Sequence, residues 1–178
     1  MTSPEILDDL RYPVGKFDKS AIDPARRAEY IGIIADLPKT ISVAVDGLDD
    51  AKLDTPYRPS GWTVRQTVHH VADSHINSYC RFKLALTENN PMIRPYEEGL
   101  WADLADSELP VEVSLKLIDG LHLRWAALLR SMTPADFEKT VDHPESGQWN
   151  LDGFLALYAW HSRHHTAHIS RLREREGW

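Results

Sequence analysis

Residues 158–172 read YAWHSRHHTAHISRL, and this short stretch carries four of the nine histidines in the 178-residue chain. Apolar residues recur between them with a helical period, so the segment predicts an amphipathic helix over about residues 151–174. The histidines are His161, His164, His165 and His168. Their positions on this helix decide whether they are solvated or hold a metal ion.

A helical wheel at 100° per residue separates the four histidines. His165 lies closest to the centre of the apolar face, and His161 is next. His168 is marginal, whereas His164 lies nearest the edge. The predicted helix therefore directs two imidazoles, spaced i and i+4, toward the interior of the protein.

Two imidazoles in this arrangement can reach one metal ion at the bond length of about 2.0–2.1 Å that zinc prefers. Neighbouring neutral imidazoles that are buried without partners would leave polar atoms unsatisfied, which is costly. The alternative is a solvated helix end. The His-Glu-x-x-His motif of zinc proteases is absent, because Ser162 occupies the position that would need Glu.

A catalytic zinc site usually has three protein ligands and one open position. The sequence VHHVADSH, residues 68–75, offers candidates for the third ligand on another predicted helix. The apolar stripe of this helix favours His75. His70 lies instead on a neighbouring stripe of small polar residues, which suits either the lining of a pocket or a solvated face. The helical pattern alone does not decide whether His70 or His75 is the third ligand.

The same polar stripe contains Arg81, a weak candidate for substrate contact, since a guanidinium can bind a carboxylate. A surface arginine is the alternative reading. No carboxylate has an obvious position as a general base, because Asp73 lies near His70 in the sequence but falls toward the surface side of the wheel. The sequence therefore names no catalytic residue beyond the metal site.

Three further amphipathic helices make the predicted fold an all-α four-helix bundle. They cover residues 23–45, 63–87 and 111–131. Asp23 is the expected N-cap of the first, and Thr63 with Gln66 forms the capping-box pattern that starts the second. The helix over 151–174 completes the set.

The remaining segments are expected to be connections within one domain over residues 1–178. Residues 1–22 are predicted as an extended lead-in, and the Asp-, Pro- and Gly-rich residues 46–62 as a loop. Residues 88–109 form a long connection with room for one short helix, and residues 140–149 suit a short hairpin. These connections are too long for a minimal up-down bundle.

Charge and composition exclude several classes of protein. The formal net charge is −7, which argues against nucleic acid or an anionic membrane surface as the main partner. No apolar run is long enough to span a bilayer, and the N-terminus lacks the pattern of a secretory signal. With the single cysteine Cys80, no intrachain disulfide can form, so a cytoplasmic protein is expected.

Several motifs together resemble the YfiT-like branch of the DinB superfamily. They are LDTPYRPSGWTVRQTVHHVADSHINSYCRFKLALTE, RPYEEGLW, LHLRWAALLR and YAWHSRHHTAHISRLREREGW. The resemblance covers most of the chain. It implies a four-helix bundle of up-down-down-up order, and the long connection over residues 88–109 fits such an order. It also implies a homodimer.

The resemblance further implies one divalent metal ion per chain, zinc first and nickel as the alternative. The family's ligands match His70, the second histidine of the pair on the 63–87 helix, and His161 with His165 on the last helix. It thus chooses His70 over His75, and it agrees with the wheel on the last helix. It gives no role to His164 or His168.

Three functions compete for such a site, two of them enzymatic with a small-molecule substrate. A metal-bound low-molecular-weight thiol would ionise to thiolate, which suits S-transfer to an electrophile of the bacillithiol transferase type. We place this reading first, because no general base is evident. Alternatively, a metal-bound water with its pKa lowered toward about 7 would supply hydroxide to a metal-dependent hydrolase. A non-enzymatic metal-binding dimer would instead close the site with a fourth ligand, His168 or His75.

Overall fold

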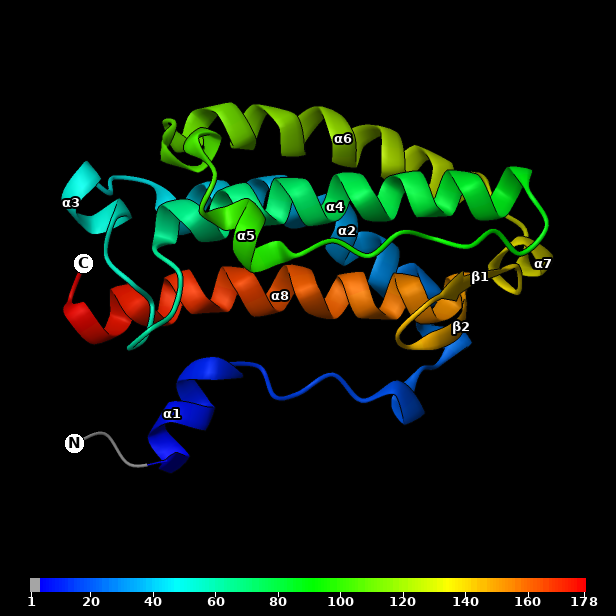
Figure 1. Ribbon diagram of the computed structural model, residues 1–178, viewed down its shortest axis with the longest axis horizontal. Coiled ribbons are helices and arrows are strands. Elements are labelled where there is room, and N and C mark those ends of the chain that lie inside the picture. Colours follow the sequence, from blue (N-terminus) through cyan, green and yellow to red (C-terminus); the bar gives the residue numbers. More distant parts are fainter. Residues whose placement is uncertain (1–3) are drawn as a thin grey trace.

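The computed structural model describes residues 4–178, and four long helices pack side by side in it (Figure 1). They are α2 (Arg27–Val45), α4 (Val64–Thr87), α6 (Val111–Ser131) and α8 (Leu151–Glu176). The colours in Figure 1 show that α4 and α6 run in one direction, while α2 and α8 run in the other. The predicted all-α bundle and its up-down-down-up order are confirmed.

Short elements connect the long helices. They are α1 (Pro4–Arg11), the 3₁₀ helices η1 (Lys19–Ala21), η2 (Pro24–Arg26) and η3 (Ala105–Glu108), α3 (Asp50–Leu53), α5 (Glu98–Ala102), α7 (Pro134–Phe137), and the antiparallel strands β1 (Thr140–His143) and β2 (Gly147–Asn150). The predicted hairpin is present, with Thr140 opposite Asn150. No helix within residues 4–178 is long and apolar enough to cross a membrane.

The start of α4 follows the predicted capping box. The Thr63 side chain accepts a hydrogen bond from the backbone N–H of Gln66 at 3.0 Å, and the Gln66 side chain accepts one from the backbone N–H of Thr63 at 3.1 Å. Two backbone donors are thereby satisfied at the helix start. Asp23 is also a cap, but it caps η2, and α2 begins only at Arg27. Local chemistry therefore positions the helix that carries His70.

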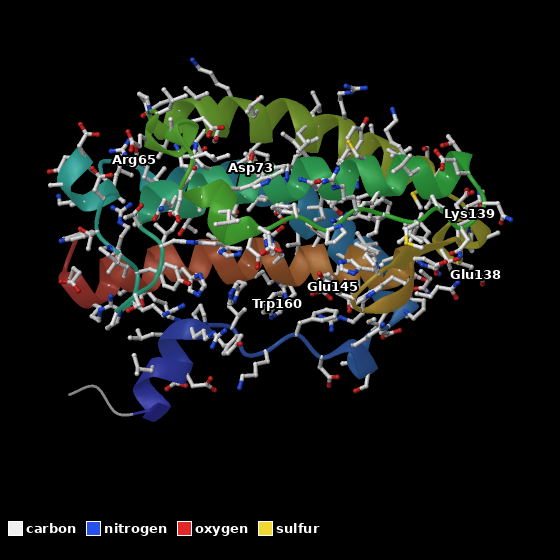
Figure 2. All side chains as sticks on the ribbon, viewed as in Figure 1. Arg65, Asp73, Glu138, Lys139, Glu145 and Trp160 are labelled. Atoms are coloured by element: carbon white, nitrogen blue, oxygen red, sulfur yellow. The ribbon has the colours of Figure 1, made fainter. Side chains whose placement is uncertain are left out.

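The prediction that residues 1–22 are extended is wrong for Pro4–Arg11, which form α1, while residues 1–3 lie outside the described part of the chain. Eight residues are too few for a stable isolated helix, so tertiary contacts are needed to hold it. The His168 ring donates a hydrogen bond from Nε2 to the backbone oxygen of Arg11 at 3.1 Å. Trp160, labelled in Figure 2 between α8 and this segment, donates to the backbone oxygen of Gly15 at 3.0 Å. Both donors lie on α8, far away in the sequence.

The long connection after α4 runs back along the bundle, as Figure 1 shows, and allows α6 to start at the same end as α4. Its first part pairs with β1: Ile93 donates its N–H to the Asp142 oxygen at 2.9 Å, and Asp142 donates its own to Pro91 at 3.0 Å. Farther along, the Gln66 side chain donates to the Ala102 oxygen at 3.0 Å. The connection is thus fixed to the bundle at both of its ends.

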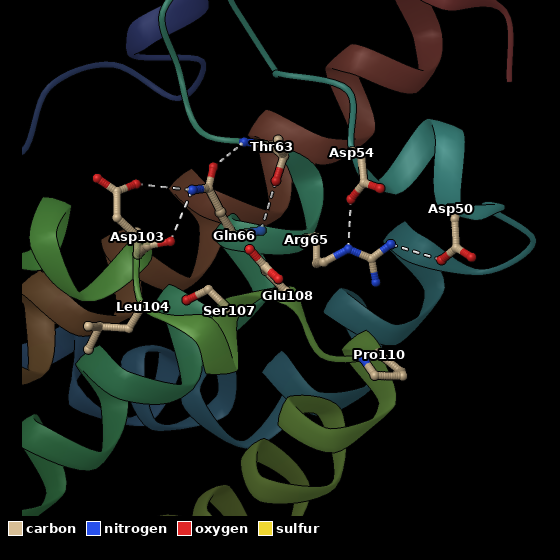
Figure 3. Close-up of a pocket in the computed structure, with 11 residues that line it drawn as sticks. Asp50, Asp54, Thr63, Arg65, Gln66, Asp103, Leu104, Ser107, Glu108 and Pro110 are labelled. Atoms are coloured by element: carbon tan, nitrogen blue, oxygen red, sulfur yellow. Dashed lines mark hydrogen bonds and ion pairs between the residues drawn. The ribbon is translucent and has the colours of Figure 1, made fainter.

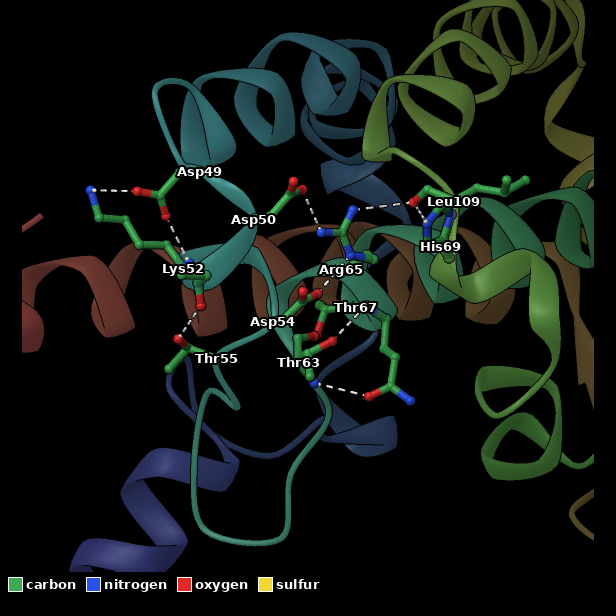
Figure 4. Close-up of polar contacts among 12 residues, drawn as sticks. Asp49, Asp50, Lys52, Asp54, Thr55, Thr63, Arg65, Thr67, His69 and Leu109 are labelled. Atoms are coloured by element: carbon green, nitrogen blue, oxygen red, sulfur yellow. Dashed lines mark hydrogen bonds and ion pairs between the residues drawn. The ribbon is translucent and has the colours of Figure 1, made fainter.

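The segment predicted as a loop over residues 46–62 contains α3, which a buried arginine ties to α4 (Figure 4). Arg65 donates to Asp54 at 2.7 Å and to Asp50 at 2.8 Å. Its third contact is the backbone oxygen of Leu109 at 3.3 Å. This guanidinium therefore joins α3, α4 and the start of α6.

The apolar core forms two clusters, and buried histidine rings pack against each of them. Trp125 belongs to the first cluster and packs edge-on against His75 and His122, with 5.7 Å between ring centroids in each pair. Tyr57 belongs to the second cluster and stacks on His168 at 3.9 Å. The interior of this bundle is therefore partly polar where the helices meet.

Candidate metal centre

Three histidines from two helices converge at one point of the bundle. One ring nitrogen from each of His70, His161 and His165 lies within 4.8 Å of the other two. The Nε2 atoms of His70 and His161 are 3.3 Å apart. Tetrahedral bonds of about 2.0–2.1 Å to a zinc ion place two ligand nitrogens about 3.3–3.4 Å apart. The spacing of these side chains therefore fits a divalent metal ion.

Burial keeps the three imidazoles in the neutral form that metal coordination requires. Burial, with a smaller contribution from the charge of nearby His164, lowers the pKa of His70 from 6.5 to about 4. Burial also lowers the pKa values of His161 and His165 well below the usual value. Each neutral ring keeps one N–H and has one nitrogen lone pair, which can bind a metal ion at neutral pH.

His75, the candidate favoured by the apolar stripe of α4, is not part of this group. Its ring is fully buried, and its Nε2 lies 3.0 Å from Nδ1 of His161. It therefore contacts His161 at Nδ1, the ring nitrogen other than the Nε2 that lies near His70. His70 and His75 both point into the interior because α4 packs against two helices, α6 and α8.

His164 and His168 lie beside the centre and form a second group with His165, again with one ring nitrogen of each within 4.8 Å. His164 stacks on Trp160 with 4.3 Å between ring centroids. His168 contacts Tyr57 and the backbone of Arg11 as described above. His164 also lies beside Tyr12, with 6.1 Å between ring centroids. Both residues therefore help to pack the N-terminal segment onto α8, and His168 also contacts the 46–62 segment.

A cavity of about 520 Å³ opens above the three histidines. Its lining includes all three, together with residues from the N-terminal segment, the 46–62 segment, α4, the long connection and α8. These are Arg11, Tyr12, Tyr57, Arg58, Trp62, Ser74, Tyr96, Glu98, Trp160 and His164, with Ser60 and Gly61. The cavity is thus assembled from segments that are distant in the sequence.

Glu98 is the functional candidate that sequence reasoning missed. It lies in the first turn of α5 and is the only carboxylate in the described lining of this cavity. Its motif, RPYEEGLW, was visible in the sequence, but nothing local indicated which part of the bundle the motif would face. The path of the long connection decides that.

Arg81 and Asp73 lie elsewhere. Arg81 is nearly buried, does not line the cavity, and donates from Nη2 to the backbone oxygen of Arg94 at 3.0 Å. It holds the long connection to α4, so a role in substrate contact finds no support. Asp73, labelled on α4 in Figure 2, is also outside the lining. Partial burial raises its pKa, and the charge of Asp106 adds to this effect.

A second cavity, of about 730 Å³, is larger but has no histidine in its lining (Figure 3). Four carboxylates line it: Asp50, Asp54, Asp103 and Glu108. The one described cation there, Arg65, already donates to Asp50 and Asp54. The contacts of Arg65 in this cavity hold α3 against α4. The histidine-lined cavity is therefore the candidate site.

Comparison with known proteins places the chain in a family. The sequence pattern of the DinB superfamily matches residues 34–169, which include all three histidines. The chain belongs to the DinB superfamily. The resemblance noted in the sequence is thereby confirmed.

Two bacterial relatives of this DinB superfamily chain match nearly its whole length. A Bacillus mycoides (strain KBAB4) protein named "Putative metal-dependent hydrolase" is 57% identical over 173 residues, covering 97% of this chain and 100% of that protein. A Bacillus cereus (strain B4264) protein named in the same way is 56% identical over 173 residues, with the same coverage. Both names concern metal-dependent hydrolysis.

A solved structure has the same fold. YfiT from Bacillus subtilis is described as "a probable metal-dependent hydrolase with an unusual four-helix bundle topology". It superposes with a TM-score of 0.91 at 46% sequence identity, covering 96% of this chain and 99% of YfiT. The unusual helix order seen here therefore occurs in an experimentally determined relative.

Proposed function

We propose that this protein is a divalent-metal-dependent hydrolase that acts on a small molecule. The observation that carries the proposal is the set of three neutral imidazoles at a cavity that also contains Glu98. The names of the relatives support the same reaction class. A bound metal ion would supply a Lewis acid and a water of lowered pKa.

The side chains of the chain have distinct tasks in this proposal. His70, His161 and His165 hold the ion and leave room on the cavity side. Glu98 acts as the general base, which accepts a proton from the attacking water. The three ligands carry no charge, so they leave the full positive charge of the ion available to the substrate.

The cavity also suits a substrate that bears an anionic group. Arg11 and Arg58 both line it, and among the lining residues that the structure describes only Glu98 opposes their charge. Arg58 donates from Nη1 to the Pro59 oxygen at 3.0 Å, while its Nε is buried without a hydrogen-bond partner among the described residues. A carboxylate or phosphate on the substrate would satisfy such a guanidinium.

The sequence favoured S-transfer from a low-molecular-weight thiol. The main argument for that function no longer applies. That preference depended on the lack of a carboxylate near the metal, and Glu98 lines the cavity. The non-enzymatic reading required a fourth ligand from His75 or His168. Among residues 4–178, neither joins the group of His70, His161 and His165.

Turnover tests the proposal directly. Zinc-loaded protein should cleave members of a panel of small ester and amide substrates without added thiol, and EDTA should abolish the activity. Glu98→Gln should lower kcat about 10²–10⁴-fold, the usual contribution of a general base. Glu97→Gln is the matched control and should leave kcat unchanged, because Glu97 does not line this cavity.

Two results would contradict the proposal. Conjugation of a thiol to an electrophile, with no hydrolysis of the panel, would favour the S-transferase. Hydrolysis that is insensitive to EDTA and to Glu98→Gln would show that another site is responsible.

The identity of the metal ion and the oligomeric state are two further parts of the proposal. We propose zinc, with nickel as the alternative, because the ligand spacing suits a tetrahedral ion. Metal analysis of the purified protein distinguishes the two ions. The homodimer stays a prediction, and light scattering in solution tests it.

A further inference from the structure

We propose that His75 and His122 form a relay that fixes the tautomer of His161, so that its Nε2 lone pair faces the metal position. The inference rests on the metal centre of the proposed function and is independent of the reaction catalysed there. Both relay residues are fully buried, and neither lines the cavity. They are therefore positioning residues.

The relay starts at a group whose role is certain. The backbone carbonyl of Ile34 can only accept a hydrogen bond, so Nδ1 of His122, 2.6 Å away, must donate. A neutral imidazole carries one N–H, and its other nitrogen is an acceptor. No carboxylate that the structure describes forms an ion pair with His122 or His75, and an unpaired buried charge would be costly. Nε2 of His122 is therefore an acceptor.

Each following ring has its tautomer fixed by the one before. Nδ1 of His75 lies 3.0 Å from Nε2 of His122 and must donate to it. Nε2 of His75 is then an acceptor, and Nδ1 of His161, 3.0 Å away, donates to it. His161 is left with a lone pair on Nε2, the atom 3.3 Å from Nε2 of His70. That is the nitrogen the metal position needs.

The relay takes one residue from each long helix: Ile34 from α2, His122 from α6, His75 from α4 and His161 from α8. The packing of all four helices thus decides the protonation of one ligand. The opposite tautomer would place the His161 N–H toward the metal position, and the ring could not coordinate there. Partners that fix a ligand tautomer commonly contribute 10–100-fold to metal affinity.

The first test reads the tautomers directly. We expect ¹⁵N NMR of the imidazoles in metal-free wild-type protein at pH 7.5 to show protonated Nδ1 in His122, His75 and His161. A spectrum with His161 protonated at Nε2 would overturn the relay, whatever the protein catalyses.

The second test measures zinc affinity by competition with a chromophoric chelator. His122→Phe keeps an aromatic ring but removes both hydrogen bonds, and it should weaken zinc binding about 10–100-fold and mix the His161 tautomers. His122→Gln retains an N–H for the Ile34 carbonyl and an oxygen for His75. It should recover most of the affinity, which a purely structural role of the ring would not predict.

His69→Gln is the matched control. His69 is a buried histidine on the same helix, with Nδ1 at 2.7 Å from the Ser114 hydroxyl and Nε2 at 3.0 Å from the Leu109 oxygen, outside the relay. It should lower stability but leave zinc affinity and the His161 tautomer unchanged. Equal zinc affinity in His122→Phe and wild type would reduce the relay to packing and overturn the inference.

Discussion

Buried imidazoles make the metal-free protein sensitive to acid. Burial lowers the pKa of His122 from 6.5 to about 4, and six other buried or half-buried histidines shift in the same direction. Between these two pH values the unfolded chain binds protons that the folded chain does not bind. The free energy of unfolding therefore falls as the pH drops from about 6.5 toward 4.

The contribution of His122 to the pH dependence of the unfolding free energy can be measured. Metal-free wild-type protein loses unfolding free energy as the pH falls from 6.5 to 4. In His122→Phe this loss should be smaller by about 3 kcal/mol, since one pKa unit corresponds to about 1.36 kcal/mol. Urea denaturation at several pH values gives the slope. Comparing slopes makes the result independent of the overall stability lost by the variant. Parallel curves for variant and wild type would contradict the lowered pKa of His122.

At the scale of the element, the start of α4 has a defined energetic role. Thr63→Ala should lower the free energy of unfolding by about 1 kcal/mol, because it removes the side-chain acceptor for the Gln66 N–H. Thr63→Ser keeps that acceptor and should stay within about 0.5 kcal/mol of wild type. Urea unfolding with zinc absent measures both. Equal losses in Ala and Ser would show that the methyl group of Thr63 matters and the cap does not.

At the scale of the whole molecule, a metal ion would join α4 to α8. His70 and His161 lie 91 positions apart in the chain, so a ligand that binds both stabilises only the folded bundle. Zinc at 100 times its Kd should raise the free energy of unfolding by about 2.7 kcal/mol, and EDTA should reverse the effect. Thermal unfolding with and without zinc tests this.

His70→Ala should abolish the stabilisation by zinc, whereas His143→Gln, on the hairpin outside the group, should retain it. If His164→Ala or His168→Ala removed the effect while His70→Ala did not, the metal would occupy the neighbouring group of histidines. That outcome would contradict the centre proposed here.

The sequence by itself determined the four long helices, the capping box of α4 and the inward direction of His161 and His165. These features depend on residues within about four positions of one another, which is the range of helical hydrogen bonds and caps. The same range explains the error at α1. Its stability comes from His168 and other residues of α8, about 150 positions away.

Only the tertiary structure decided which buried face of α4 meets which neighbour. His75 lies between His122 on α6 and Nδ1 of His161 on α8, while His70 faces Nε2 of His161. Both lie in the interior, so one apolar stripe cannot distinguish them. The place of Glu98 likewise depends on the return path of the long connection across the bundle. Periodicity reports that a side chain is buried; the packing of the helices sets what it is buried against.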